Sequence, residues 1–220
     1  MNNPERGFSF SNNGPLDMRM NRSEKETAED IIASMSETEL ADIFYELGEE
    51  RKSRKIAEAI VKERKENRVN STVWLAEVIE KAVGGRRGRI HPATKAFQAL
   101  RIAVNNELDS LEKGLSAGLN LLVPGGRMAV ISFHSLEDRI VKKFFKRHVG
   151  RWESLQGGGR NWEGEKPAVS LVNRKVVKPA REETEKNSIN VLNPPFASNL
   201  RHAREIIMRK KMPSIEPRQS

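Results

Sequence analysis

Hydrophobic positions between residues 23 and 83 recur every three or four residues, which predicts four consecutive short helices. A serine followed three residues later by a glutamate is the capping-box pattern, and it is expected to begin the first two helices. The two boxes are Ser23 with Glu26, ahead of Ile31 and Ile32, and Ser36 with Glu39, ahead of a stripe that ends at Gly48. The third helix is expected over residues 51–64, and the fourth follows Ser71. Because no strand pattern interrupts these helices, they predict a compact all-helical domain.

After residue 90 the pattern changes to that of an α/β unit. Apolar residues recur with helical spacing from Phe97 to Leu122, which predicts one long helix with a single apolar side. Pro124 to Gly126 is expected to end this helix. An apolar strand is predicted from Met128 to Phe133, and Ser135 and Asp138 are expected to cap the helix that follows it. A strand that leads directly into a helix is typical of open α/β sheets, whose chemistry lies beyond the carboxyl ends of their strands.

The periodic signal weakens beyond Gly150. Residues 151–167 are expected to form a loop, and residues 169–177 are expected to supply one strand. The segment from Arg209 to Ser220 is predicted to be a disordered basic tail.

The composition narrows the classes of partner. The chain has 220 residues, with 39 Lys and Arg against 30 Asp and Glu, a formal net charge of +9 and an isoelectric point near 9.9. This balance favours a polyanionic partner, with nucleic acid first and an anionic membrane surface second. No apolar stretch approaches the length of a membrane span, and no secretory signal is recognised. Because the sequence has no cysteine and its four histidines lack metal-ligand spacing, neither a disulfide nor a metal site is expected.

Four segments carry a resemblance to a known family. They are Glu5 to Phe10 (ERGFSF) with Gly14 to Met20 (GPLDMRM), Gly48 to Arg51 with Ser53 to Ala57, His91 to Ile102 (HPATKAFQALRI), and Pro124 to Phe145 (PGGRMAVISFHSLEDRIVKKFF). On these residues the chain is identified as a member of the small-subunit ribosomal RNA (cytosine-N4)-methyltransferase family, the methyltransferase H type. The resemblance implies an enzyme of the α/β class with a class I (Rossmann-like) fold. It also implies S-adenosylmethionine as cofactor and small-subunit ribosomal RNA as substrate.

Members of this family carry a further amino-terminal half, which holds the glycine-rich cofactor turn and precedes the ERGFSF loop. The resemblance therefore implies that this chain is the distal part of the fold, with the first cofactor-binding strands absent and no cofactor-binding residue of its own. The expected organisation is an active-site-proximal loop over 1–22, an inserted helical RNA-recognition domain over 23–90, the distal α/β part over 91–187, and a divergent, basic carboxyl-terminal segment over 188–220. The glycine cluster Gly157 to Gly159 is interpreted as a loop, because no strand precedes it.

Two places offer candidates for the substrate pocket, while the catalytic base stays unassigned. In the loop the candidates are Arg6, Phe8, Phe10, Asp17 and Arg19, and at the end of the predicted strand they are His134 and Ser135. The two phenylalanines either form a rim on which a base stacks, with Arg6 as a phosphate clamp, or anchor the loop in the core. Asp17 and Arg19 either form a structural ion pair or line the pocket. His134 is either a substrate-side group or a histidine whose hydrogen bonds are satisfied within the fold.

Basic residues gather on the third predicted helix and on the hinge that follows the helical domain. The candidates for RNA contact are Arg51, Lys52, Arg54, Lys55, Arg86, Arg87 and Arg89. A run of charge on a helix is often only a solvated face. Here positive charge predominates, which favours contact with RNA phosphates and salt-dependent binding.

The segment Asn193 to Phe196 reads NPPF, the signature of another class of amino-methyltransferases. In those enzymes the asparagine side chain and a backbone carbonyl accept hydrogen bonds from the target amine. No glycine-rich cofactor turn accompanies the signature in this sequence, which argues against an active site of that class. In the family that the chain resembles, basic residues are usual after the Asn-Pro pair, so the departure indicates that the terminal strands are remodelled.

The sequence leaves three interpretations open. The first is a ribosomal RNA cytosine-N4 methyltransferase polypeptide that is inactive alone, the second is a non-catalytic RNA-binding remnant, and the third is an independent NPPF enzyme. Expected partners are small-subunit ribosomal RNA and either the missing half or a second copy, since the stripe from Phe97 to Leu122 would otherwise be exposed. No membrane partner is expected. The expected compartment is the cytoplasm, or an organellar matrix or stroma if a presequence was lost.

Overall fold

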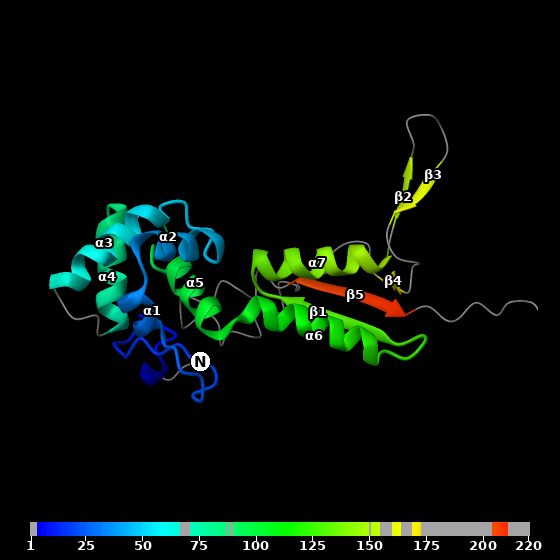
Figure 1. The fold of residues 1–220 in the computed structure, drawn as a ribbon, viewed down its shortest axis with the longest axis horizontal. Helices are drawn as coiled ribbons and strands as arrows, with labels where there is room; N and C mark the ends of the chain where they lie inside the picture. The colour runs from blue at the N-terminus through cyan, green and yellow to red at the C-terminus, as the bar shows by residue number, and fades with distance from the viewer. Residues whose placement is uncertain are drawn as a thin grey trace, which may run out of the picture. The chain divides into compact units, whose positions relative to one another are not determined.

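The computed structural model describes residues 4–66, 71–86, 88, 90–149, 151–154, 160–163, 169–172 and 204–210 (Figure 1). These residues form two compact units, one ending at Glu107 and the other beginning at Leu108. The amino-terminal unit is helical, and the carboxyl-terminal unit combines helices with small sheets. Among the described helices, none has both the length and the apolar character that crossing a membrane requires.

The amino-terminal unit confirms the predicted succession of short helices. A 3-10 helix, η1 (Pro4–Arg6), precedes α1 (Ala28–Ser34), α2 (Glu37–Glu46), α3 (Ser53–Glu66), α4 (Thr72–Val83) and α5 (Thr94–Asn105). The capping box predicted for α2 is present, with Glu39 N–H donating to the Ser36 hydroxyl at 3.3 Å and Ser36 N–H donating to Glu39 Oε2 at 2.8 Å. Ser71 caps α4 by accepting a hydrogen bond from Trp74 N–H at 3.2 Å.

The capping box predicted at Ser23 is wrong. Helix α1 begins with Thr27, whose hydroxyl accepts from Asp30 N–H at 3.1 Å, and Asp30 Oδ2 accepts from Thr27 N–H at 2.9 Å. Ser23 lies in a turn and donates its N–H to Asn21 Oδ1 at 3.1 Å. Aspartate completes a box as well as glutamate does when it stands three residues after the cap. A pattern that requires glutamate therefore predicts the helix cap four residues too early.

Helix α5 packs in the same core as α1 to α4. The largest fully buried side chains come from each helix, and they include Ile31, Phe44, Ile56, Ile60, Leu75, Ile79, Phe97 and Leu100. Figure 1 shows α5 passing beside α1 and α2, with which it makes contacts. The compact helical unit therefore extends to Glu107, beyond the boundary predicted after residue 90.

The loop between η1 and α1 is an integral part of this unit. Leu16 and Met18 are fully buried in the helical core. Gly7 has a φ of +68°, and a Cβ at this position would lie 2.1 Å from the Pro15 carbonyl oxygen, so only glycine fits. At the start of α4, the Thr72 hydroxyl donates to the Asn12 carbonyl at 3.1 Å. The loop is thus tied to the helices by burial and by hydrogen bonds.

The long helix predicted from Phe97 to Leu122 is wrong, because the chain breaks after Asn105 into α5 and α6 (Glu107–Leu121). Asn106 has φ 47° and ψ 44°, a left-handed conformation that asparagine tolerates better than most residues. The buried Arg101 donates to Glu107 across the break, with Nε–Oε1 at 2.7 Å and Nη2–Oε2 at 2.8 Å. Residues six apart do not face each other on a straight helix, so this ion pair requires the turn at Asn106.

The carboxyl-terminal unit contains a three-stranded antiparallel sheet. Besides α6 it holds β1 (Arg127–Ser132), α7 (Ser135–Val149), β2 (Arg151–Ser154), β3 (Arg160–Glu163), β4 (Val169–Leu171) and β5 (Arg204–Lys210). Strand β5 lies between β1 and β4 and is antiparallel to both, with Met208 opposite Met128 and Leu171. Strands β1 and β4 therefore point in the same direction on either side of β5, and α7, β2 and β3 lie between them in the chain.

One face of this sheet carries the second hydrophobic core. Leu115 of α6 and Val141 and Phe145 of α7 cluster with Val169 of β4 and Met208 of β5. In Figure 1 both helices run alongside the strands. The strand predicted from Met128 to Phe133 is confirmed as β1, and β4 lies within the segment predicted to supply one strand.

Two predictions for the carboxyl-terminal region are wrong. Residues 151–167, expected to form a loop, include β2 and β3, which pair in antiparallel register with Trp152 opposite Trp162. Arg209 and Lys210, expected to begin a disordered tail, belong to β5 at the centre of the three-stranded antiparallel sheet. Strands of four residues with several charged side chains are too short for a periodic pattern, and β5 depends on its neighbours in the sheet.

Candidate functional site

Asp17 and Arg19 of the loop form a bidentate ion pair. Arg19 Nε donates to Asp17 Oδ1 at 2.8 Å, and Arg19 Nη2 donates to Asp17 Oδ2 at 2.9 Å. Hydrogen bonding to the Arg19 side chain lowers the pKa of the Asp17 carboxyl group, and the same contact raises the pKa of Arg19. Arg19 Nη1 also donates to the Glu24 carbonyl at 2.7 Å. The pair holds the loop against the segment that leads to α1, as the structural alternative expects.

Arg6 is engaged with the same loop. Its Nη2 donates to the carbonyl oxygens of Arg19 at 2.6 Å and Met20 at 2.8 Å. Its guanidinium carbon lies 5.3 Å from the centre of the Phe8 ring, within cation–π range. Arg6 thus closes the loop over its own backbone, with two carbonyl groups as acceptors.

Both loop phenylalanines pack inside the helical unit. Phe8 is 3% exposed, so its ring offers no face for a stacked base. Phe10 is half-buried, with its ring 4.8 Å from Phe97 in an edge-on arrangement and 4.6 Å from the His91 ring. This position corresponds to the alternative in which the two rings anchor the loop in the core.

His134 lies at the junction of β1 and α7, in the carboxyl-terminal unit. The Glu137 carboxylate accepts hydrogen bonds from the N–H groups of Phe133 at 2.7 Å and His134 at 3.3 Å. Glu137 N–H donates to His134 Nδ1 at 3.4 Å, and His134 Nε2 lies 3.4 Å from Glu137 Oε1. His134 and Glu137 thus form a box at the start of α7, one residue ahead of the predicted cap pair Ser135 and Asp138. Asp138 also accepts from Lys142 Nζ at 2.7 Å.

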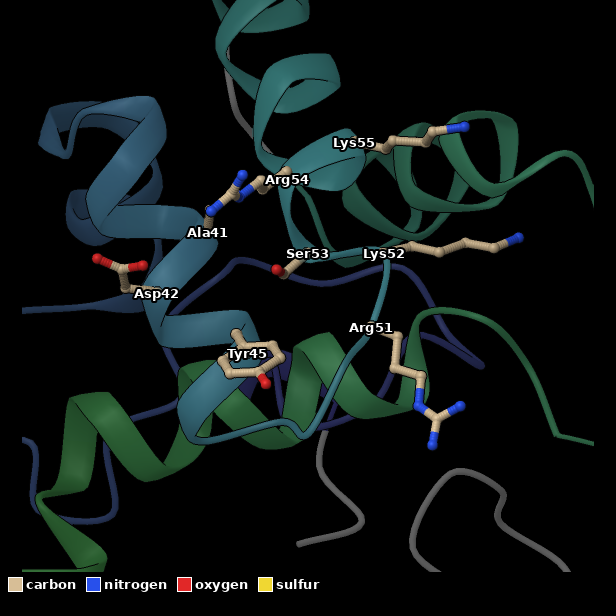
Figure 2. A pocket seen from close by; sticks show the side chains of 8 residues that line it. All are labelled: Ala41, Asp42, Tyr45, Arg51, Lys52, Ser53, Arg54 and Lys55. Carbon is tan, nitrogen blue, oxygen red and sulfur yellow. The ribbon is translucent and has the colours of Figure 1, made fainter.

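A cavity of about 600 Å³ lies between α2 and the start of α3 (Figure 2). The α2 side is lined by Ala41, Asp42 and Tyr45, and the other side by the residues from Arg51 to Lys55. Four of the predicted RNA-contact residues, Arg51, Lys52, Arg54 and Lys55, thus line one cavity. Arg86 follows α4 outside any helix or strand, and Arg87 and Arg89 lie outside the described residues.

Four of the lining residues, Ala41, Asp42, Tyr45 and Ser53, were not among the predicted RNA contacts. Tyr45 is the single tyrosine of the chain and is 62% exposed, whereas Ser53 is 5% exposed and Asp42 is exposed. Tyr45 could have been selected from the sequence, because an aromatic residue directly after the buried Phe44 lies on the exposed face of the helix. Ser53 gave no comparable signal, because only the packing of α2 beside α3 makes its hydroxyl part of a cavity.

The candidates therefore fall into separate groups. The loop residues Arg6 to Arg19 and the basic cavity belong to the amino-terminal unit, and His134 and Ser135 belong to the carboxyl-terminal unit. The NPPF segment from Asn193 to Phe196 and the glycine cluster Gly157 to Gly159 lie outside the described residues.

Comparison with known proteins identifies the family. The model of the MraW methylase family matches residues 1–191. The ribosomal RNA small subunit methyltransferase H of a Caulobacter species is 50% identical over 184 residues, which cover 81% of this chain and 56% of the relative. The protein of the same name from Coprothermobacter proteolyticus is 50% identical over 183 residues, covering 83% of this chain and 56% of the relative. The protein of that name from Carboxydothermus hydrogenoformans is 47% identical over 188 residues, covering 85% and 60%.

These matches have two consequences. The chain spans a little more than half the length of the relatives it matches. Its combination of helices with small sheets is compatible with a methyltransferase family. On the match to residues 1–191 and on identities near one half, the chain belongs to the MraW methylase family.

Proposed function

We propose that this chain is part of an S-adenosylmethionine-dependent enzyme that methylates the N4 amine of a cytidine in small-subunit ribosomal RNA. The observation that carries the proposal is the identity of about one half to proteins named ribosomal RNA small subunit methyltransferase H. The four motif segments in the loop, at the start of α3, in α5 and at the β1–α7 junction support the same reaction. The net charge of +9 suits an RNA substrate.

The chemistry of the reaction defines what the protein must supply. The lone pair of the cytosine N4 amine is delocalised into the ring, so the amine is a weak nucleophile. An enzyme acting on this atom takes the base out of its stack and holds the nitrogen in line with the methyl donor. An acceptor for an amine proton is also needed. In this proposal the chain binds and orients the RNA, and the catalytic acceptor stays unassigned.

His134 is the proposed substrate-side group of the carboxyl-terminal unit. It stands at the carboxyl end of β1, the position where α/β sheets hold their substrates. Its ring is oriented by Glu137, which contacts both the backbone and the imidazole. Ser135 begins α7 beside it. In the amino-terminal unit, Arg6, Asp17 and Arg19 are proposed as positioning residues that hold the loop.

Methyltransferases of this kind generally use S-adenosylmethionine, and the β1–α7 junction does not fit that cofactor. At the β1–α7 junction, Phe133 and His134 stand where a glycine-rich turn would be needed, and their N–H groups already donate to Glu137. A cofactor carboxylate placed there would meet another carboxylate instead of free donors. We therefore assign the cofactor to residues beyond those described, in a further part of the enzyme supplied in the same or a separate polypeptide.

Methyl transfer to ribosomal RNA tests the proposal. Small ribosomal subunits and isotope-labelled S-adenosylmethionine are incubated with the full chain, alone and together with the segment of the Caulobacter relative that the chain does not span. Chromatography and mass spectrometry of the nucleosides separate N4-methylcytidine from its 5-methyl isomer. We expect N4-methylcytidine when both pieces are present and folded. Formation of the 5-methyl isomer, or no methylated cytidine from folded pieces, would contradict the proposal.

Two further measurements separate the alternatives. Calorimetry of S-adenosylmethionine with the chain alone, with circular dichroism as the fold control, is expected to show no binding. Micromolar binding would contradict the cofactor assignment and would favour the NPPF segment from Asn193 to Phe196 as a site. RNA binding without methyl transfer in any combination would favour a non-catalytic RNA-binding protein, which the basic cavity at α3 also supports. A His134→Asn variant keeps a good helix cap while removing the imidazole, so it tests the substrate-side role without unfolding α7.

A further inference from the structure

The first turn of α3 has hydrogen-bond donors without acceptors among the described residues. The Ser53 N–H donates to the Glu50 carbonyl at 3.2 Å, which satisfies the first helical donor. The next two N–H groups, of Arg54 and Lys55, meet no acceptor within the described ranges. The first N–H groups of a helix have no partner inside the helix and point out of its end. Two backbone donors are therefore left at the end of α3 that borders the cavity.

Ser53 supplies a third donor at the same place. Its side chain is buried, with 5% of the residue exposed, and it lines the cavity. No described residue accepts from or donates to its hydroxyl. Figure 2 shows the hydroxyl directed from the start of α3 toward α2, on the same side as the Arg54 guanidinium, whereas the Lys52 and Lys55 side chains extend the other way. The hydroxyl oxygen itself is open to the cavity, so it can donate to an acceptor bound there.

The charges at the cavity select an anion as that acceptor. Arg51, Arg54 and Lys55 surround the start of α3, and the first turn of this helix has no acidic residue. Positive side chains at a helix N-terminus are repelled by the helix dipole, and a bound anion offsets that repulsion. The amine of Lys52 donates to the Val83 carbonyl at 2.9 Å and is therefore less free to bind an anion.

Tyr45 adds to the cavity a ring on which a base can stack. Its exposed ring lies on α2 across from Ser53 (Figure 2). The volume of about 600 Å³ falls within the range of roughly 300–1,000 Å³ found for small-molecule sites, so a whole nucleotide can enter. An exposed aromatic ring is a surface on which any base can stack, whatever its identity. Asp42, on the α2 side, repels a phosphate and so favours its placement at the α3 end.

The turn that carries these groups is held in place before any ligand binds. Glu50 N–H donates to the Phe44 carbonyl at 3.0 Å, and Lys52 N–H donates to Glu50 Oε1 at 2.9 Å. Lys95 Nζ donates to the Glu49 carbonyl at 2.8 Å. Glu49 itself has a φ of 51°, a conformation that is unfavourable for a residue with a side chain and that tends to persist at functional sites.

We propose that the cavity between α2 and α3 binds one nucleotide of a single-stranded segment of the RNA substrate. Its backbone phosphate accepts from Ser53 Oγ, from the free N–H groups of α3 and from Arg54, and its base stacks on Tyr45. The proposal rests on the proposed function for the statement that the partner is RNA. It adds a contact away from the target cytidine, which sets the register of the RNA on the helical unit.

The salt dependence of RNA binding tests the phosphate contact. The full chain and a Ser53→Ala, Arg54→Gln double variant are titrated with a short single-stranded RNA oligonucleotide at several salt concentrations. Loss of one phosphate contact is expected to reduce the slope of log affinity against log salt by about 0.7 in magnitude. Lys62→Gln is the matched control, because Lys62 is exposed on the same helix but does not line the cavity. The control is expected to keep the wild-type slope, and both variants are checked for folding by circular dichroism.

The single tyrosine allows a direct test of stacking. Incorporation of 3-fluorotyrosine gives one fluorine resonance, from position 45, which is expected to move on titration with the oligonucleotide. Tyr45→Phe is expected to keep the affinity, because it retains the ring, and Tyr45→Ala is expected to lower it about 5- to 100-fold, in line with the loss of one stacked base.

The outcomes distinguish this inference from the function on which it rests. A wild-type slope in the double variant together with an unmoved resonance, in a protein that still binds RNA, overturns the cavity site and leaves the proposed function intact. A folded wild-type chain that binds no RNA at any salt concentration overturns both. A reduced slope, an unchanged Lys62→Gln control and a shifted resonance support the site.

Discussion

Gly48 stands at the closest approach between α2 and α5, and its replacement by alanine is expected to destabilise the helical unit. A Cβ at this position would lie 2.7 Å from the carbonyl oxygens of both Lys95 and Phe44, and 3.2 Å from the Ala99 side chain. Gly48 is not among the glycines with positive φ. The effect of the substitution is therefore steric and does not come from backbone strain.

The magnitude follows from two opposing terms. The Lys95 carbonyl belongs to α5 and the Phe44 carbonyl to α2, so relief of the overlap requires α5 to move away and the turn after α2 to change its conformation. Overpacking of this kind typically costs about 1–3 kcal/mol. The reduced entropy of the unfolded chain on replacing glycine by alanine returns about 0.4–1 kcal/mol. We expect a net loss of about 1.3 kcal/mol, the midpoint of the first range less the midpoint of the second.

Gly114 provides a control, because the same glycine-to-alanine change is expected to raise stability there. It lies inside α6, is exposed, and has no atom within 4 Å of the position of an added Cβ. Gly114→Ala is therefore expected to stabilise its unit by about 0.5–1 kcal/mol through helix propensity alone. The two substitutions are compared by urea denaturation followed by circular dichroism. Amide hydrogen exchange on peptides from α5 and α6 reports on the two units separately.

Whether Gly48→Ala lowers or raises the stability of the protein tests the steric argument. A loss of 1 kcal/mol lowers the melting temperature of a unit of roughly this size by about 4–8 °C. Weakened exchange protection in α5, with unchanged protection in α6, would place the loss in the helical unit. If Gly48→Ala stabilises the protein as Gly114→Ala does, the close approach of α2 to α5 is not the constraint described above.

Three further predictions concern stability. Thr27→Ala is expected to cost about 1 kcal/mol through loss of the α1 cap, whereas Ser23→Ala stays within about 0.5 kcal/mol of the wild type in thermal denaturation. The folded-state pKa of Asp17 is lowered below 3.8 by its contact with Arg19, so its contribution to stability is present above that pH and is lost as the pH falls through the folded value. Asp17→Asn should therefore reduce stability at neutral pH and flatten the acid side of a plot of denaturation midpoint against pH. Phe145→Ala, at a position 1% exposed in the second core, should cost about 3–5 kcal/mol and remove exchange protection from β5.

Short sequence patterns predicted the helix caps and the strand that depend on residues close together in the chain. The box at Ser36 and the cap at Ser71 are hydrogen bonds between residues three apart, so a short pattern contains all the information. The strand β1 was recognised because an apolar run lies between a Pro-Gly-Gly turn and a helix pattern. The box at Thr27 was missed by a narrow pattern, and the information for it was present in the sequence.

The elements that were missed depend on tertiary contacts. The apolar stripe continues through Asn106 without a change of period, but its first part is buried in the helical core and its second part packs against the sheet. Periodicity reports which residues are buried and not which core buries them. The break becomes visible only through the Arg101–Glu107 pair, whose six-residue separation excludes a straight helix. Similarly, the basic sequence of β5 does not by itself predict a central strand. β5 takes that position because it pairs with β1 on one side and β4 on the other.

The charged residues of the candidate site could be predicted from the sequence, but the cavity that they line could not. The basic residues Arg51 to Lys55 were selected because positive charge is concentrated in this segment, and four of them line one cavity. The donors that define an anion site within it, Ser53 Oγ and two backbone N–H groups, carry no charge and therefore gave no signal in the composition. For the loop, the sequence offered alternatives for Phe8 and Phe10, and burial alone distinguishes them.

The stability of the helical unit and the shape of the cavity depend on the same contacts. The close approach at Gly48 fixes the end of α2, and the Lys95 amine fixes the Glu49 carbonyl one residue later. Both contacts come from α5, which is the helix that also holds the loop phenylalanine Phe10 through Phe97. The turn into α3 is therefore determined by the core and not by the ligand, so its donors keep their positions when the cavity is empty. A preformed site binds with little loss of conformational entropy, which explains why unsatisfied donors and a strained Glu49 are tolerated at this turn.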